Sequence, residues 1–361
     1  MGTTPGERPD QPEPVRVGPG ARILTTDYHT AGEPFRIVTG IVTGGVTELA
    51  GASVLDRRSD AMERFDDVRA FLVNEPRGHA DMYGCFVTPA DDDRGALGAV
   101  FFHKDGFSTA CGHGTIALAT WAVHEGLVPV VEPTTSFAID VPSGRLAVEV
   151  EVVGGEVSGA SFVNVASFVT ATDIEIDVGG RVVPVDVSFG GAFYASLDLA
   201  APALATLGLT ATPACLTELI AIGRRVRTAL DGHWSLAHPS EPRLSGCYGT
   251  IFYEAIPDRG LGFAQRNVTV FADGEVDRSP CGSGTSARLA VLHHRGVLEV
   301  AAPLDHVSIV GSSFRASVIG TTTVHGLPAV VTRVAGRAHR TGTHEFVLDA
   351  ADELGLGFQL R

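Results

Sequence analysis

The sequence predicts a mixed α/β fold built from two related domains. One pattern, Cys-Gly-x-Gly-Thr-x-Ala, occurs at residues 111–117 and again at residues 281–287. Long stretches of alternating Val, Ile and Phe predict strands, while 43 glycines and 20 prolines favour many turns and few helices. With 361 residues the chain is long enough to form two cores.

The strands are predicted from short apolar or alternating runs between turn residues. They are expected at residues 22–26, 35–43, 98–103, 249–256 and 267–272. Two longer regions, 136–189 and 307–361, are predicted to be β-rich, the first with turns at its Gly-Gly pairs. Residues 1–20, rich in Pro, Gly and charge, predict a disordered tail.

The helices are predicted from apolar residues at helical spacing and from capping residues. They are expected over residues 59–74, 115–125, 212–230 and 277–295, the last including its leading loop. Ser59 is expected to cap the first of them, and Thr212 the third. The apolar stripe of the first helix is formed by Met62, Phe65, Val68 and Leu72.

Charge and composition exclude several classes of protein. Acidic residues outnumber Lys and Arg by 42 to 27, which argues against binding to nucleic acid or to an anionic membrane. The single lysine, Lys104, lies in His-Lys-Asp-Gly and fits neither a P-loop nor a Schiff-base site. No apolar run is long enough to span a membrane, and the N-terminus lacks a secretory apolar segment. A cytoplasmic protein with reduced thiols is therefore expected.

The five cysteines predict neither a disulfide framework nor a metal site. Their number is odd and no Cys-x-x-Cys occurs. The adjacent histidines His293 and His294 fall on a predicted helix and point to different faces. We therefore expect no bound metal and no cofactor.

The two repeated motifs place Cys111 and Cys281 at the starts of helices. The first N–H groups of a helix favour negative charge, so a thiol there is expected to have a lowered pKa. The glycines allow a substrate carboxylate to approach these N–H groups. If the domains face each other, one thiolate removes a proton from a carbon and the opposite thiol returns one, so that the configuration is inverted.

Other interpretations of the cysteines remain open. A free cysteine is more often a small buried apolar residue than a catalyst, and this reading applies to Cys85, Cys215 and Cys247. The repeat favours chemistry for Cys111 and Cys281. A dinucleotide site at Gly-x-Gly-x-x-Ala does not explain the preceding cysteines. Thiol–disulfide exchange is a further alternative, if the two sulfurs can approach.

At these residues the sequence resembles the proline racemase family. The resemblance is carried by DYHTAGEP at 27–34, ACGHG at 110–114 and DRSPCGSGTSA at 277–287, and it covers essentially everything after the tail. RGHADMYG at 77–84 and FGGAFYA at 189–195 are also similar to family segments. The resemblance implies two similar domains of the diaminopimelate-epimerase type, each a β-rich shell around a central helix, with the active site between them.

The resemblance also implies a domain division and site residues. Residues 21–152 with 341–361 would form the first domain, and 153–340 the second. Cys111 and Cys281 would be the paired bases. Asp277 would bind the cationic ring nitrogen of the substrate. The residues expected to line the substrate are Gly112, His113, Gly282 and Ser283, largely through backbone N–H groups.

The two cysteines favour one branch of this family. Its dehydratases typically carry Thr or Ser at one of the two positions, whereas this chain has Cys at both. The sequence therefore predicts a cofactor-independent epimerase that converts trans-4-hydroxy-L-proline to cis-4-hydroxy-D-proline, or a proline racemase. A trans-3-hydroxy-L-proline dehydratase and a non-catalytic amino-acid-binding relative are the alternatives. The expected partner is a small imino acid, and a homodimer is one assembly left open.

Overall fold

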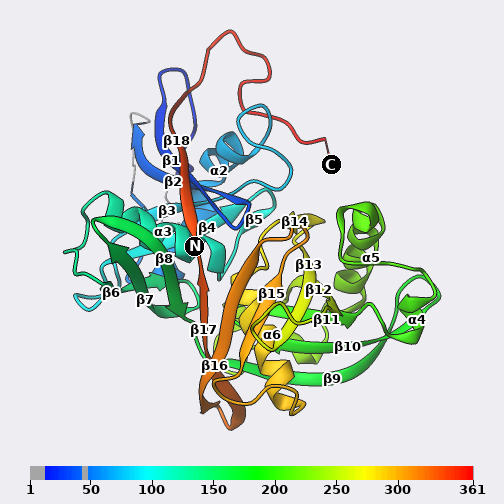
Figure 1. Ribbon diagram of the computed structural model, residues 1–361. Coiled ribbons are helices and arrows are strands. Elements are labelled where there is room, and N and C mark those ends of the chain that lie inside the picture. Colours follow the sequence, from blue (N-terminus) through cyan, green and yellow to red (C-terminus); the bar gives the residue numbers. More distant parts are fainter. Residues whose placement is uncertain (1–12, 43–47, 361) are drawn as a thin grey trace, which may run out of the picture.

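The computed structural model describes residues 13–42 and 48–360, which form an upper and a lower half in Figure 1. The strands of the upper half are β1 (Arg22–Thr30), β2 (Glu33–Val42), β3 (Tyr83–Thr88), β4 (Leu97–His103), β5 (Gly106–Phe107), β6 (Thr134–Val141), β7 (Gly144–Val153), β8 (Glu156–Val163) and β18 (Ala338–Val347). Those of the lower half are β9 (Ser167–Asp177), β10 (Val182–Phe189), β11 (Phe193–Asp198), β12 (Cys247–Ala255), β13 (Phe263–Phe271), β14 (Glu275–Asp277), β15 (Pro303–Val307), β16 (Ser313–Val324) and β17 (Leu327–Gly336).

The helices are fewer than the strands, as the composition predicts. Two of them, α3 (Gly112–His124) and α6 (Gly282–His294), are central to the two halves. The others are α1 (Val54–Arg64), α2 (Asp66–Val73), α4 (Pro202–Ala205) and α5 (Leu216–Ala229). In the part of the chain that the structure describes, no helix is both long and apolar enough to cross a membrane.

In the lower half the strand pairings close into a ring. β9 pairs with β10, β10 with β11, β11 with β12 and β12 with β13. β13 pairs in parallel with β15, which continues through β16 to β17, and β17 returns to β9. The ring encloses α6, whose residues from Gly282 to Leu292 are all buried. A helix buried on every side suits a barrel interior.

The upper half repeats this plan with a sheet around α3. β1 lies between β2 and β18, and the sheet continues through β3, β4, β6 and β7 to β8. β8 also pairs with β17 of the lower half. Apart from His124, every residue of α3 is buried. The predicted mixed α/β fold, with a strand-rich shell around a central helix in each half, is confirmed.

The chain crosses between the halves more than once. β18, red in Figure 1, runs antiparallel to β1, so that Val347 lies opposite Arg22. β8 packs against α3 and β9 against α6. The exact division into domains, with its boundary after residue 152, stays a prediction.

The helix predicted over 59–74 differs from the structure in two ways. It begins earlier, at Val54, where Ser53 and Asp56 form a capping box, so Ser59 is not the cap. It is also interrupted at Phe65, whose backbone is not helical, and α2 follows. Met62, predicted in the apolar stripe, is 51% exposed. The prediction was wrong here because apolar residues at helical spacing do not reveal a single non-helical residue between two helices.

The predicted helix over 212–230 is present in shorter form. A 3₁₀ turn at Pro213–Cys215 precedes α5, and the side chain of Thr212 makes no capping hydrogen bond. Leu219 and Val226 of α5 are fully buried.

The predicted disordered tail covers residues 1–20, of which 1–12 lie outside the described residues. For the remainder the prediction was wrong. Val15 and Val17 are buried against the apolar side of α1 and α2, and the Val15 N–H donates to the Arg64 carbonyl at 2.7 Å. Two valines at alternate positions cover that apolar surface, and this outweighs the polar composition around them.

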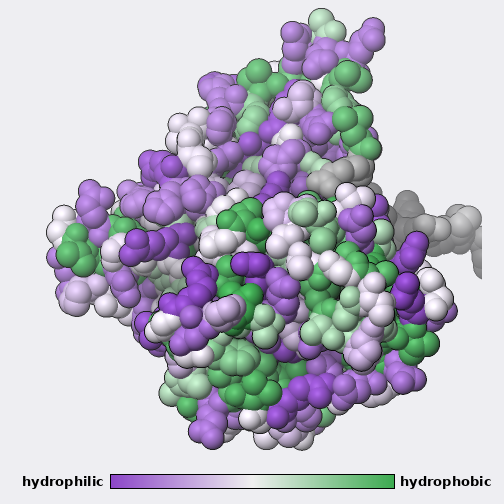
Figure 2. Space-filling model, turned by 45° about the vertical axis from the view of Figure 1, so that its right-hand side comes forward, coloured by the Kyte–Doolittle hydropathy of each residue, from purple (hydrophilic) through white to green (hydrophobic). Residues whose placement is uncertain are grey.

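The outer surface is mixed in polarity. Figure 2 shows apolar residues in several separate patches between hydrophilic ones on the face it draws. Isolated apolar surface of this kind is normal for a folded protein.

Candidate active site

The first turns of α3 and α6 meet between the two halves. Gly112 and Gly282 are in such close contact that a Cβ atom on Gly112 would lie 2.4 Å from the Gly282 Cα. Both helices have 13 residues and follow directly after the repeated cysteine. The positive ends of two buried helices therefore point toward one place, and unpaired N–H groups there favour an anionic ligand group.

The two cysteines occupy equivalent sequence positions but different backbone conformations. Cys111 is extended, with φ −152°, and its sulfur accepts a hydrogen bond from the Gly114 N–H at 3.3 Å. Cys281 has φ 62°, in the left-handed region, and its N–H donates to the Ser279 hydroxyl at 3.1 Å. A left-handed non-glycine residue is uncommon and occurs preferentially at functional sites.

A small cavity between the halves collects the predicted site residues. Its volume of about 10 Å³ is roughly that of one water molecule. Gly282 closes against Gly112 at its edge. The cavity is lined by the predicted residues Cys111, Gly112, His113, Asp277, Cys281 and Ser283, and also by Tyr83, Ala110, Tyr194, Tyr248 and Phe271. All seven predicted site residues are thus brought together, although their roles stay predictions.

On the α3 side, His113 links Cys111 to Asp277. The His113 Nε2 atom lies 3.4 Å from the Cys111 sulfur, and Nδ1 lies 3.7 Å from the Asp277 carboxylate. Asp277 in turn accepts a hydrogen bond from the Ser279 N–H at 2.8 Å. The carboxylate is buried, so it places negative charge where a cationic ligand group could be held.

On the α6 side, Tyr194 takes the corresponding position. Its hydroxyl lies 3.7 Å from the Cys281 sulfur and 2.7 Å from the Ser283 hydroxyl. Tyr194 is fully buried on β11. Each sulfur therefore has a side-chain neighbour that can share its proton, an imidazole for Cys111 and a phenol for Cys281, and Thr269 also bonds to the Cys281 sulfur.

The pKa values of both thiols differ from the sequence prediction. Burial raises the pKa of Cys111 well above its ordinary value, although the Gly114 N–H opposes this shift. Burial also raises the pKa of Cys281, and the negative charge of Asp277 adds to the rise. The expected lowering of the thiol pKa was wrong. Burial removes water from around the thiolate, and this raises the pKa by more than the N–H groups of the helix start lower it.

Behind Asp277 lies a second buried carboxyl group. Glu33 accepts a hydrogen bond from the Arg278 N–H at 2.7 Å. Burial and the neighbouring Asp277 charge raise the pKa of Glu33. Glu33 therefore favours its neutral form.

The aromatic side of the cavity was not predicted from the sequence. Tyr83 and Tyr248 come from opposite halves, and their hydroxyl groups lie 2.9 Å apart. The ring of Tyr248 stacks on Phe271. Tyr83 and Tyr194 lie within the family-like segments 77–84 and 189–195. Their place in these segments, and the polar hydroxyl that each carries, were the signals that could have indicated a role in the site. Tyr248 and Phe271 carried no such signal.

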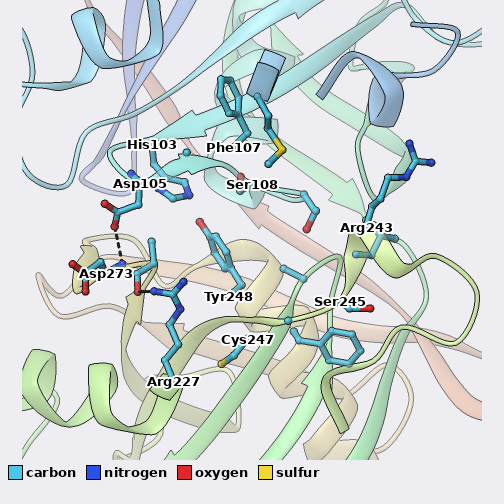
Figure 3. A pocket seen from close by; sticks show the side chains of 18 of the residues that line it. His103, Asp105, Phe107, Ser108, Arg227, Arg243, Ser245, Cys247, Tyr248 and Asp273 are labelled. Carbon is cyan, nitrogen blue, oxygen red and sulfur yellow. Dashed lines mark hydrogen bonds between the residues drawn. The ribbon is translucent and has the colours of Figure 1, made fainter. Parts of the chain in front are cut away.

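A larger cleft adjoins the small cavity and shares Tyr248 with it (Figure 3). Its volume is about 650 Å³. Two contacts span it: the Asp273 N–H donates to Asp105 at 2.7 Å, and Arg243 pairs with Asp56 at 2.9 Å. The small cavity itself holds no more than about one water molecule, so the halves as they stand leave no room in it for a larger ligand.

Comparison with known proteins gives consistent matches over nearly the whole chain. The family model described as proline racemase matches residues 25–359. A trans-3-hydroxy-L-proline dehydratase of Bacillus cereus is 40% identical over 341 residues, which are 94% of this chain and 99% of that protein. A 3-hydroxyproline 2-epimerase of Burkholderia multivorans is 40% identical over 340 residues, which are 94% and 98% of the two chains.

A solved structure shares the fold. A hydroxyproline epimerase from Agrobacterium vitis, with bound trans-4-hydroxy-L-proline, superposes with a TM-score of 0.83 and 30% identity, over 94% of this chain and 96% of that one. The two strand-rich halves with their central helices are thus the diaminopimelate-epimerase-like fold that the sequence predicts.

Proposed function

The chain belongs to the proline racemase family, and on this premise we propose that it inverts the α-carbon of a proline-type imino acid through Cys111 and Cys281. The proposed substrate is 4-hydroxyproline or proline. One observation carries the proposal: two helix starts, each with a cysteine, face one small cavity from opposite halves. A planar carbanion held between two sulfurs can lose a proton on one face and gain one on the other.

The residues around the sulfurs suit such a substrate. The carboxylate would lie against the N–H groups of the two helix starts, which also stabilise the charge that develops when the α-proton leaves. The cationic ring nitrogen would lie near Asp277. Because each ionised sulfur disfavours ionisation of the other, the pair would hold one proton between its two members.

The names of the relatives favour a second candidate. The B. cereus relative is a dehydratase of trans-3-hydroxy-L-proline, and the B. multivorans relative is an epimerase of 3-hydroxyproline. Both reactions begin with removal of the α-proton. They differ from the first candidate in the position of the ring hydroxyl and, for the dehydratase, in its loss.

Proton NMR in D₂O separates these candidates. Purified protein would be incubated separately with L-proline, trans-4-hydroxy-L-proline and trans-3-hydroxy-L-proline, without added cofactor. Loss of the α-proton signal with appearance of the epimer of proline or 4-hydroxyproline would support the proposal. An unsaturated product from the third compound alone would favour the dehydratase. No change in any of the three would contradict the family chemistry and favour a binding protein.

Three variants test the sulfur pair. Cys111→Ser and Cys281→Ser are each expected to lower inversion by at least about 100-fold, since each removes one of the two proton carriers. Cys215→Ser is the matched control, because Cys215 is a free thiol outside the cavity. Inversion that survives either of the first two substitutions would contradict the two-base assignment.

A further inference from the structure

Asp81 of the upper half lies next to the strand that bears Asp277 in the lower half. One oxygen of its carboxylate accepts a hydrogen bond from the Val276 N–H at 3.1 Å, and the other pairs with the Arg278 guanidinium at 3.5 Å. The backbone carbonyl of Asp81 also accepts from the Arg278 guanidinium, at 3.1 Å. One buried residue therefore bonds to both sequence neighbours of Asp277.

The strand that bears Asp277 is too short to be held firmly by its own ladder. β14 has three residues and pairs antiparallel with β13. Residues of an antiparallel pair exchange hydrogen bonds at every second position, so a strand of this length makes few of them. The Asp277 carboxylate accepts from the Ser279 N–H, but Ser279 belongs to the same segment and moves with it. The contacts with Asp81 therefore add an anchor that lies outside this segment.

This anchor crosses between the two halves. Asp81 lies two residues before Tyr83, with which β3 of the upper half begins. Glu33, also of the upper half, supports the same segment through the Arg278 N–H, which it accepts at 2.7 Å. Contacts between the halves exist only while the halves are together. The segment around Asp277 therefore has its full set of anchors only in the closed protein.

We propose that Asp81 is a positioning residue, which holds the Asp277 carboxylate at the cavity when the two halves meet. The site for a cationic ring nitrogen is then complete only in the closed protein, where the exclusion of water strengthens the attraction between opposite charges. Asp81 is not among the described residues that line the cavity, so it acts through Asp277. This inference rests on the proposed function, which gives Asp277 the ring nitrogen as its partner.

Asp105 provides the comparison for a residue that only helps to hold the halves together. Its carboxylate also accepts a backbone N–H across the halves, that of Asp273 at 2.7 Å. Asp273 lies before β14, and Asp105 lines the larger cleft instead of the small cavity. Loss of a contact that only joins the halves should affect every ligand alike, whereas loss of Asp81 should affect ligands with a cationic nitrogen most.

A double-mutant cycle tests whether Asp81 acts through Asp277. Asp81→Ala is expected to lower kcat/KM for α-proton exchange about tenfold, the equivalent of one charged hydrogen bond. In the Asp277→Asn background the same change should cost less than about twofold, because residues that act together have non-additive effects. Asp105→Ala is the matched control, and its effect should be the same in both backgrounds.

Two ligands separate positioning from general damage. Pyrrole-2-carboxylate has the ring size and the carboxylate of proline, but its nitrogen carries no charge. Asp81→Ala should weaken the binding of L-proline about tenfold and that of pyrrole-2-carboxylate less than about twofold, as measured by calorimetry. Asp81→Asn keeps an oxygen for the Val276 N–H and should lie between the wild type and Asp81→Ala. It also serves as the test variant if Asp81→Ala does not fold.

A crystal structure of Asp81→Ala gives a readout that does not depend on activity. The Asp277 carboxylate should leave the cavity while Cys281 keeps its place. An unmoved Asp277, additive effects of Asp81→Ala and Asp277→Asn, or equal weakening of the two ligands would overturn the positioning role. Absence of α-proton exchange on every imino acid would instead defeat the proposed function, and the crystal structure would still decide whether Asp81 holds Asp277.

Discussion

Gly112 and Gly282, the first residues of α3 and α6, touch across the two halves of the molecule, with room for a hydrogen atom but not for a methyl group. The contact brings two helix starts to one point and fixes how closely the halves can approach. It is a requirement of the fold and of the candidate site at once, because the same residues bear the N–H groups that face the cavity.

Gly112→Ala should therefore impair both stability and activity. The added Cβ would meet Gly282 backbone atoms at 2.4 and 2.8 Å, and overpacking of this kind costs about 1–3 kcal/mol. Urea unfolding measures the loss, and the NMR exchange assay measures activity. Gly320→Ala is the control, because a Cβ there meets nothing within 4 Å. Equal behaviour of the two variants would refute the close contact.

Asp277→Asn is expected to weaken substrate binding more than folding. The amide keeps an oxygen for the Ser279 N–H but loses the charge proposed to face the ring nitrogen. A charged hydrogen bond is worth about 1.5–3 kcal/mol, so kcat/KM should fall roughly 10- to 100-fold. Asp273→Asn, an exposed change in the adjoining cleft, serves as the reference. A kcat/KM that matches the wild type would remove Asp277 from the site.

The raised thiol pKa values predict that activity increases with pH. Below the first thiol pKa of the pair, each unit of pH yields up to about tenfold more of the form with one thiolate. Burial raises the pKa of both Cys111 and Cys281, so kcat/KM for inversion should rise between about pH 7 and 9, near the ordinary cysteine pKa. Rates from α-proton exchange at low substrate concentration would show this. A flat profile would mean that the thiolate forms at lower pH.

The capping box at the start of α1 gives a test of the fold alone. Ser53 accepts from the Asp56 N–H at 3.1 Å, and the Asp56 carboxylate accepts from the Ser53 N–H at 3.2 Å. Ser53→Ala should cost about 1 kcal/mol of unfolding free energy. Ser59→Ala should cost much less, since the Ser59 hydroxyl donates to the Leu55 carbonyl within the helix. Equal losses would restore Ser59 as a cap.

His306 predicts a loss of stability in acid. It is fully buried beside Arg288, its Nδ1 pairs with the Thr285 hydroxyl at 2.7 Å, and burial lowers its pKa to about 3. The unfolded chain binds a proton near pH 6.5 and the folded chain does not, so the unfolding free energy should fall as pH drops below about 6.5. The slope from this group is at most about 1.4 kcal/mol per unit.

Unfolding in urea at pH 7, 6 and 5 measures that slope. His306→Gln removes the titrating group and should flatten the dependence by the contribution of one proton. If the variant and the wild type lose stability in parallel, other groups account for the acid sensitivity.

The elements set by local pattern were predictable. The repeated cysteine motif predicted the positions of α3 and α6 to within a few residues. Small and apolar residues after a glycine-rich start are typical of a buried helix. The start of α1 was missed because Ser53 precedes a charged stretch with few apolar residues. Without an apolar stripe the helix is not recognised from the sequence, and its capping residue is then not recognised either. The break at Phe65 leaves no mark in the apolar spacing.

The candidate site was predictable only where one motif carried it. Cys111, His113 and Ser283 stand in the two copies of the repeat, and Asp277 precedes the second copy in a segment that carries the family resemblance. Tyr248 comes from a strand with no distinctive neighbours and reaches the cavity through the fold. The thiol pKa values could not follow from sequence, since they depend on how completely two halves exclude water.

The pairing of β18 with β1 has a consequence for biosynthesis. β1 leaves the ribosome well before β18, and one of its edges gains its partner only when residues 338–347 have been made. Until then that edge offers unpaired N–H and C=O groups to other chains. Translation therefore supplies all the strands of the lower barrel before the last strand of the upper sheet. The upper half, whose first strands are made before those of the lower half, is the later of the two to be complete.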